Sequence, residues 1–203
     1  MTQRQVLYAA LALTLLAVVC VFTVDGPAAM AARDLSRDAR RAVSSFTTAV
    51  EIAFAFPIGK FLVGLLLIVA GGVLATMRKR VGWALLFVGA SHVTARFIAG
   101  VLKTVFARIR PYEAITASGW NDDWFAEVGN AFPSGHAAHF WGFFFPLAML
   151  FPRWRIPLLI LPLLVSISRV MANDHYVADV VGSAAIAAFV TLAFAQFLWK
   201  RSV

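Results

Sequence analysis

The sequence predicts an all-α integral membrane protein, a bundle of six transmembrane helices with an interfacial amphipathic helix between the first two. Hydrophobic residues make up 61% of its 203 residues and charged residues only 14%, against roughly 25% charged residues in an average soluble domain. Apolar runs close to the length of a membrane span recur along the chain, and the charged residues between them are divided by sign. A soluble domain of this size cannot bury so much apolar surface, so we expect a lipid environment.

Six segments are apolar enough to be candidate spanning helices, which need about 20 mostly apolar residues. In chain order they are residues 5–24, 57–77, 81–101, 137–151, 156–168 and 180–199. The fourth and fifth segments are short, and we expect their flanking residues to extend them. No flexible linker and no internal repeat divides the chain, so we predict a single domain over residues 1–203.

The first segment is open to a second interpretation, because residues 29–32 resemble the cleavage site of a signal peptide. Its apolar stretch of about 18 residues is longer than the usual 7–15 residues of a signal-peptide core. We therefore expect a helix that is retained.

Lysine and arginine gather on one side of the predicted membrane. With the N-terminus in the cytoplasm, the cytoplasmic segments carry no acid, and all ten carboxylates fall on the other side. The basic residues of these segments are Arg4, Arg78, Lys79, Arg80, Arg153, Arg155, Lys200 and Arg201. This pattern obeys the positive-inside rule. The net charge of +8 is therefore a topology signal, and we expect no nucleic-acid partner.

The segment between the first two spans, residues 31–54, has two faces when drawn at 100° per residue. Its apolar face contains Leu35, Ala39, Ala42, Val43, Phe46 and Val50, and its polar face contains Arg33, Asp34, Arg37, Asp38, Arg40, Arg41 and Glu51. This pattern predicts an amphipathic helix that lies in the membrane interface. The helix is either a surface linker packed on the bundle, which we favour, or one wall of a groove through which a lipid enters.

Charged and polar residues form three clusters on the predicted outer side, where such residues are costly and tend to be functional. The first cluster contains Lys103, Arg108 and Arg110, followed by Pro111. Lys103 and Arg110 are seven residues apart and share a face if the helix continues to that point. Two cations on one face suit an anion with several oxygens.

The second cluster is Pro133-Ser134-Gly135-His136, immediately before the fourth apolar segment. We expect Ser134 to cap that helix and Gly135 to allow another group to approach the backbone. The free N–H groups of the helix N-terminus would then bind an anion beside His136.

The third cluster contains Ser168 and Arg169, then His175 and Asp179. A spacing of four residues lets Asp179 hydrogen-bond one nitrogen of His175 and leaves the other nitrogen free to attack. We expect Asn173 or Asp174 to cap this helix. The six-helix topology brings all three clusters to one side, where they would form a phosphate cage with a nucleophile and an acid.

These three clusters, in this order and with these spacings, resemble the signature of the type 2 phosphatidic acid phosphatase superfamily. The resemblance implies that His175 is the nucleophile, Asp179 orients it and His136 is the general acid. The same resemblance implies that the phosphate is bound by Lys103, Arg110, Ser134, Gly135 and Arg169. No metal or other cofactor is implied, because cations and backbone N–H groups neutralise the charge that develops on the transferred group.

The resemblance implies an enzyme that hydrolyses a lipid phosphate or pyrophosphate through a phosphohistidine. The candidate substrates are undecaprenyl pyrophosphate, phosphatidic acid, phosphatidylglycerol phosphate and a lipid A phosphate. A lipid phosphotransferase using the same phosphohistidine is the main alternative, and a transporter or scaffold that binds an anion without turnover is another. We expect a bacterial inner-membrane protein with its active site facing the periplasm. The oligomeric state is left open.

Other polar residues have less specific expectations. We expect His92 and Arg96 to belong to a buried network, with contact to a second phosphate as the sharper alternative for Arg96, and His139 to pack behind His136. We expect Asp122, Asp123 and Glu127 to lie in a solvated loop rather than to bind a metal.

Overall fold

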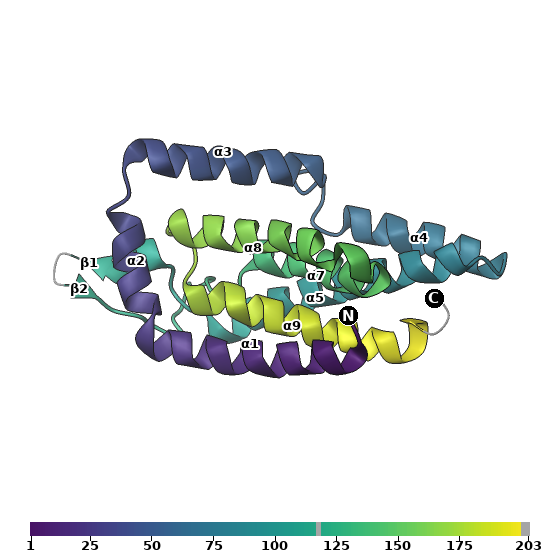
Figure 1. Cartoon of the computed structure of the whole chain (residues 1–203). Helices are drawn as coiled ribbons and strands as arrows, with labels where there is room; N and C mark the ends of the chain where they lie inside the picture. Colours follow the sequence, from purple (N-terminus) through teal and green to yellow (C-terminus); the bar gives the residue numbers. More distant parts are fainter. Residues whose placement is uncertain (117–118, 200–203) are drawn as a thin grey trace.

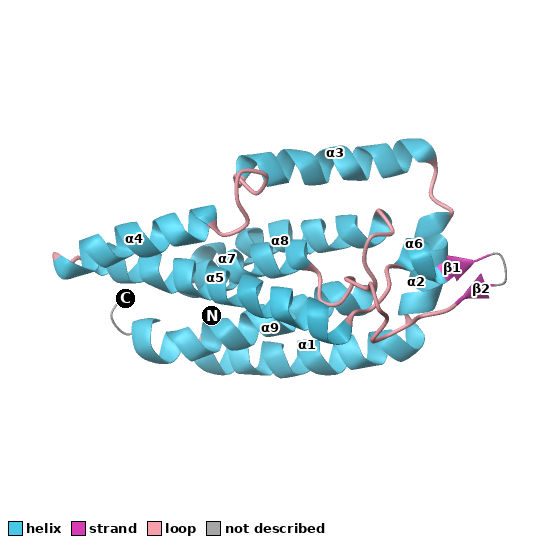
Figure 2. Cartoon of the chain, turned by 180° about the vertical axis from the view of Figure 1, so that it is seen from behind, coloured by secondary structure: helices cyan, strands magenta, loops and turns pink. Residues whose placement is uncertain are grey.

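The computed structural model describes residues 1–116 and 119–199, which are almost entirely helical (Figures 1 and 2). In chain order the elements are α1 (Gln3–Thr23), α2 (Asp25–Arg33), α3 (Arg37–Ala53), α4 (Leu62–Thr76), α5 (Arg80–Phe106), α6 (Pro111–Ala114), β1 (Ile115–Thr116), β2 (Gly119–Trp120), α7 (Gly135–Leu150), η1 (Pro152–Trp154), α8 (Arg155–Met171), α9 (Val177–Phe194) and η2 (Ala195–Trp199). The two short strands pair antiparallel. Lys200 and Arg201 lie outside the described residues.

Helix α7 is at the centre of the bundle, where it packs against α5, α8 and α9, while α1 packs on α9 and α4 packs on α5. Most residues of α7 are buried. Phe87, Phe145 and Met149 form the core together with the small side chains of α9, of which Ala184 and Ala187 are buried. Small residues on one helix face let neighbouring helices approach closely, and this close packing holds the ends of α5, α7 and α9 near one another.

Four helical stretches within the described residues are long and apolar enough to cross a membrane, namely Gln3–Thr23, Arg80–Ala114, Pro152–Met171 and Val177–Leu198. These correspond to the first, third, fifth and sixth predicted segments. The second and fourth segments form α4, with 15 residues, and α7, with 16 residues. At 1.5 Å per residue, neither helix reaches the roughly 30 Å of a bilayer core. The crossing of α4 and α7, and with it the count of six, stays a prediction.

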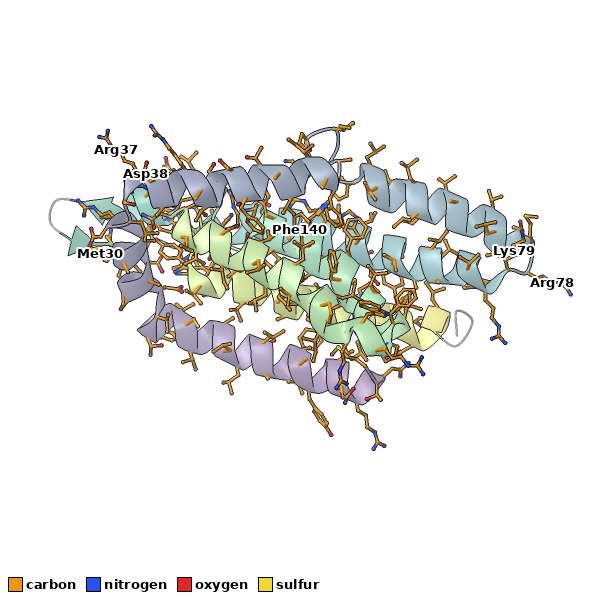
Figure 3. All side chains as sticks on the ribbon, turned by 45° about the horizontal axis from the view of Figure 1, so that its top comes forward. Met30, Arg37, Asp38, Arg78, Lys79 and Phe140 are labelled. Atoms are coloured by element: carbon orange, nitrogen blue, oxygen red, sulfur yellow. The ribbon has the colours of Figure 1, made fainter. Side chains whose placement is uncertain are left out.

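Basic residues predicted to be cytoplasmic lie at one end of the bundle (Figure 3). The N-terminus lies beside the end of α7, where the Met1 amino group donates to the backbone oxygen of Ala148 over 3.2 Å. Arg78 and Lys79, in the turn between α4 and α5, also lie far from Met30 and Asp38, which mark the opposite end. This separation is the one expected from the positive-inside pattern.

The segment predicted to be amphipathic forms α3, which runs alongside α8 and antiparallel to it (Figure 1). Its attachment includes a buried hydrogen bond of 2.9 Å from the Thr47 hydroxyl to the Ser168 hydroxyl of α8. Its position in the membrane interface stays a prediction. Helix α3 is nevertheless more than a linker, because its last turn reaches the predicted site.

Candidate active site

The second cluster begins α7 as predicted. The Ser134 hydroxyl caps the helix by accepting a hydrogen bond from the backbone N–H of Ala137 over 3.4 Å, so the expected cap is confirmed. The backbone of Ser134 is also tied to α9. Its N–H donates to the backbone oxygen of Asp179 over 3.1 Å, and its own carbonyl accepts from the Ser183 hydroxyl over 2.9 Å. The second and third clusters are therefore in direct contact.

The third cluster places a histidine and a carboxylate together at the start of α9. The Nδ1 atom of His175 lies 3.4 Å from Oδ2 of Asp179, and both side chains are buried. The same carboxylate oxygen accepts a 2.9 Å hydrogen bond from the backbone N–H of Tyr176. The expectation that Asn173 or Asp174 caps this helix is wrong, because α9 begins after Tyr176 and Asp179 bonds back to the N-terminal N–H.

The first cluster is split by a helix end. Helix α5 stops at Phe106, and Ala107 is left-handed with φ of 39°. Lys103 and Arg110 therefore do not share a helix face, which corrects the sequence-based expectation. They meet instead at Asn130, where the ammonium group of Lys103 donates to the backbone oxygen and Nε of Arg110 donates to Oδ1 of the side chain over 2.6 Å.

Asp174 connects the first and third clusters. Its carboxylate lies 2.8 Å from a guanidinium nitrogen of Arg169 and 3.8 Å from one of Arg110. The side chains of Arg110 and Asp174 are about three-quarters buried, with exposed fractions of 25% and 27%. Two arginines from different segments are thus held toward the same point, although the sequence indicated no role for Asp174 beyond a helix cap.

The environment of His175 shows that these groups converge. Burial lowers the pKa of His175 well below its usual value, and the positive charges of Lys103, Arg169 and Arg110, with His136, lower it further. Nearby positive charges disfavour the protonated imidazolium, so residues from all three clusters act on one imidazole. That imidazole is neutral near pH 7, which is the state a nucleophile requires.

Behind Asp179 lies a buried ion network that the sequence did not predict. The guanidinium group of Arg108 contacts three carboxylates, at 2.8 Å from Asp25, 2.5 Å from Asp122 and 2.8 Å from Asp179. It also lies 3.7 Å from the ring centroid of Tyr176. The three carboxylates come from α2, from α9 and from the loop that precedes α7. By joining them, Arg108 fixes the position of Asp179, the carboxylate that faces His175.

Two members of this network correct or extend the sequence interpretation. Asp122 was expected in a solvated loop, but its side chain is only 10% exposed. Asp25 is completely buried, and its second carboxylate oxygen accepts from the backbone N–H of Ala178 over 2.9 Å. The sequence did contain a sign that Asp25 has a partner. It follows directly after a long apolar run, where an ionised group needs a partner.

A second carboxylate that the sequence missed faces His136. Nε2 of His136 lies 2.7 Å from Oε1 of Glu51, and the two side chains are 21% and 19% exposed. The ring of Phe56 stacks on His136 at 4.6 Å between centroids. The hydrogen bond from His136 lowers the pKa of Glu51 below its usual value. Glu51 had been placed on the polar face of a surface helix, so this contact assigns α3 a part in the site.

His92 and His139 form a buried pair beneath the site. Nε2 of His92 lies 2.9 Å from Nδ1 of His139, and His92 stacks on Phe143 at 3.8 Å between centroids. The expected burial of His92 is confirmed, but its hydrogen-bond partner is His139, whereas the predicted network joined it to Arg96. Both histidines are fully buried, which gives them a packing role between α5 and α7.

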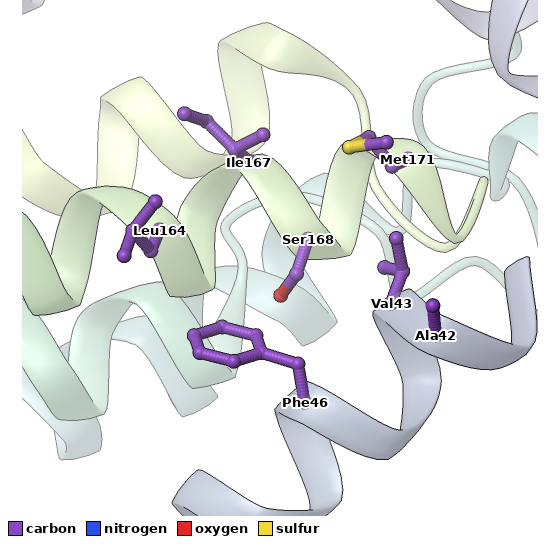
Figure 4. Close-up of a pocket in the computed structure, with 7 residues that line it drawn as sticks. All are labelled: Ala42, Val43, Phe46, Leu164, Ile167, Ser168 and Met171. Atoms are coloured by element: carbon purple, nitrogen blue, oxygen red, sulfur yellow. The ribbon is translucent and has the colours of Figure 1, made fainter. Parts of the chain in front are cut away.

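Two apolar clefts open beside the site. One lies between α3 and α8, where Phe46 and Ser168 point toward one another (Figure 4). The other lies along α4 and α5 and is lined by Phe61, Phe97 and Leu65. The walls of the first cleft and of the part of the second cleft near Leu65 suit hydrocarbon, whereas Arg96 and Lys60 line the remainder of the second cleft.

Within residues 1–116 and 119–199, no group of three or more His, Cys, Asp or Glu side chains is arranged to hold a metal ion. Asp122, one of the three acidic residues of the loop before α7, contacts Arg108.

Comparison with known proteins agrees with the family resemblance drawn from the sequence. Residues 82–202 match the family model described as the PAP2 superfamily. Two curated relatives are each called lipid A 1-phosphatase. The one from Rhizobium johnstonii is 29% identical over 117 residues, which cover 55% of this chain and 47% of the relative. The one from Rhizobium etli is 28% identical over 117 residues, covering 55% and 49%. The chain spans about half the length of these relatives.

The fold has a solved counterpart. The chain is similar to the crystal structure of the first transmembrane PAP2 type phosphatidylglycerolphosphate phosphatase from Bacillus subtilis, with a TM-score of 0.62 and 21% sequence identity. The similarity covers 95% of this chain and 97% of the other. It therefore extends over the helices outside the family match, including α1 and α3.

Proposed function

The chain belongs to the PAP2 superfamily, and on this premise we propose that it is a metal-independent membrane phosphatase that hydrolyses a lipid phosphate or pyrophosphate through a phosphohistidine at His175. The observation that carries the proposal is the contact of the buried His175 imidazole with Asp179. Beside it, Asp174 holds Arg110 and Arg169, and the backbone N–H of Ser134 donates to the backbone oxygen of Asp179. A cage of this kind suits a phosphoryl group, whose oxygens need several donors.

In the proposed first step, Nε2 of His175 attacks phosphorus while Asp179 accepts from Nδ1. The N–P bond forms, the P–O bond to the leaving group breaks, and His136 gives its proton to the departing oxygen. Lys103, Arg110 and Arg169, with the N–H groups beside Ser134 and Gly135, bind the phosphoryl oxygens. Asp179 stabilises the positive charge that develops on His175.

In the proposed second step, water attacks the phosphohistidine and His136 accepts its proton. The N–P bond breaks and inorganic phosphate leaves, which returns His175 to its neutral form. The three cations and the N-terminus of α7 supply the charge neutralisation that a metal ion supplies in other phosphoryl-transfer sites.

A lipid substrate is supported by the membrane bundle and by the two largely apolar clefts near the site. The candidates are undecaprenyl pyrophosphate, phosphatidic acid, phosphatidylglycerol phosphate and a lipid A phosphate. We place the protein in a bacterial inner membrane with the site facing the periplasm, because the N-terminus and the basic turn between α4 and α5 lie at the end away from the site. A phosphotransferase would use the same first step and pass the phosphoryl group to a lipid acceptor.

The proposal is tested by phosphate release from purified protein in detergent with EDTA present. The panel contains the four candidate lipids and a water-soluble phosphate ester. We expect release from at least one lipid, undiminished by the chelator and faster than from the soluble ester. Loss of all activity on chelation, restored by a divalent cation, would contradict it. Transfer to an added lipid acceptor that outpaces hydrolysis would favour the phosphotransferase.

Glu51→Gln should lower kcat by about tenfold on a lipid monoester, because a hydrogen bond to a charged group contributes about 1.5–3 kcal/mol. The loss should be smaller on p-nitrophenyl phosphate, whose leaving group needs little protonation. Removing the negative charge that favours protonated His136 should also move the alkaline limb of the pH–rate profile to lower pH.

Asp38→Asn is the matched control for Glu51→Gln. It changes a carboxylate to an amide on the same helix, where the side chain is 95% exposed, and it should leave kcat and the pH profile unchanged. An equal loss on both leaving groups in Glu51→Gln, without a shift of the alkaline limb, would show that Glu51 only holds α3 in place.

A further inference from the structure

Arg96, in the middle of α5, is a buried cation without a carboxylate partner among the described residues. It is 8% exposed, and its Nε atom has no hydrogen-bond partner. By contrast, the three arginines of the predicted clusters have carboxylate partners, since Arg108 contacts three carboxylates and both Arg110 and Arg169 contact Asp174. A buried charge without a counterion is costly, so this position requires an anion that is not part of the chain.

The guanidinium group of Arg96 is pressed against the phosphate cage. A Cβ atom added to Gly135 would lie 2.3 Å from Nη1 of Arg96 and 3.0 Å from its Cζ. Gly135 therefore lets the guanidinium group contact the backbone at the N-terminus of α7. Arg96 is also close enough to Lys103 and His136 for their charges to interact. A ligand of Arg96 must consequently lie next to the transferred phosphoryl group.

The other side of Arg96 opens into the cleft along α4 and α5. This cleft has a volume of about 400 Å³, and its polar lining residues are Arg96, Lys60 and Thr104. Phe61 and Phe97 form its apolar walls and also line the adjoining apolar cleft toward Leu65. Two cations, a hydroxyl group and an apolar continuation match an anionic group that is followed by a hydrocarbon chain.

We propose that Arg96 and Lys60 form a second phosphate subsite, which binds a phosphate group of the lipid headgroup other than the one that is transferred. The lipid chain would leave this subsite along Phe61 and Phe97. In a diphosphate, the phosphoryl group passes to His175, the bridging P–O bond breaks, and the lipid monophosphate departs with the electron pair, its charge neutralised by Arg96. The inference rests on the proposed function and narrows its substrate class to headgroups with two phosphates.

The test compares Arg96→Gln and Lys60→Gln on lipids matched in their chains. One pair is farnesyl diphosphate and farnesyl monophosphate, and the other is phosphatidylglycerol phosphate and phosphatidic acid. Arg96→Gln should lower kcat/KM for the two-phosphate lipids at least about tenfold more than for their partners, the equivalent of one charge-assisted hydrogen bond. The two pairs distinguish an anhydride-linked second phosphate from one separated by glycerol. Lys60→Gln should act in the same direction with a smaller loss.

Arg80→Gln is the control, since it removes an exposed arginine from the opposite end of the same helix. Equal losses on one-phosphate and two-phosphate lipids would overturn the proposal, because Arg96 would then serve the transferred group or the fold. If Arg96→Gln does not fold, the same comparison of kcat/KM between two-phosphate and one-phosphate lipids is made with Arg96→Lys and with Lys60→Gln, which changes an exposed side chain.

Failure of the proposed function is distinguishable from failure of the subsite. If the wild-type chain releases no phosphate from any of the four lipids, binding is measured by tryptophan fluorescence with pyrophosphate and with phosphate. The subsite predicts that Arg96→Gln weakens binding of pyrophosphate at least about tenfold and leaves binding of phosphate nearly unchanged. Equal weakening of both anions would overturn it.

Discussion

His175→Ala should slow phosphate release by about 10⁴-fold or more, because removal of a nucleophile typically eliminates almost all of the chemical step. The substitution leaves the cations of the cage in place, so the variant should still bind substrate. His175→Asn, which keeps a polar group facing Asp179, should be equally inactive. The measurement is single-turnover phosphate release, with thermal unfolding in detergent as the check on folding.

The protonation of His175 adds a pH prediction to this experiment. Because its pKa is lowered well below its usual value, the neutral nucleophile should persist on the acid side of pH 6.5, the unperturbed pKa of histidine. In the pH–rate profile of the wild-type protein, the acid limb that reports protonation of His175 should therefore lie below pH 6.5. Retention of substantial activity by His175→Ala would refute the nucleophile.

Arg108→Met should destabilise the protein by about 3–5 kcal/mol, because it leaves buried carboxylates without their partner. Three segments lose a common contact, namely α2 at Asp25, the loop at Asp122 and α9 at Asp179. Urea or thermal unfolding in detergent measures the loss, and activity should fall with it because Asp179 is no longer held.

Two further variants make the Arg108 prediction specific. Arg153→Met removes an exposed arginine at the other end of the bundle and should have no comparable effect. Adding Asp25→Asn to Arg108→Met removes one uncompensated charge and should recover part of the lost stability. A double variant less stable than Arg108→Met would contradict the electrostatic explanation.

The sequence was sufficient to find the three clusters and most of the helices, because both depend on local pattern. Apolar runs predict α1, α5, α8 and α9, and the Ser134 cap follows from residues within one turn of each other. The contact between Ser134 and Asp179 joins segments far apart in the chain. Only the expected helix topology predicted that these segments would meet.

The contacts that sequence reasoning missed are tertiary. Asp25 and Arg108 are 83 residues apart, and no local pattern pairs them. The end of α5 was misjudged because Ala107 adopts a left-handed conformation, which alanine propensity alone does not predict. Glu51 was assigned to the polar face of a surface helix, and only the packing of α3 on α8 turns it toward His136.

The most direct measurement of the central claim is chemical trapping of the phosphorylated protein. The purified chain is mixed with a lipid substrate in EDTA, quenched within a single turnover under alkaline conditions that preserve phosphohistidine, and analysed by peptide mass spectrometry. We expect one phosphoryl group on His175, absent from His175→Asn. An active protein that carries the phosphoryl group on another residue, or that turns over substrate without any trapped phosphoenzyme, would contradict the account.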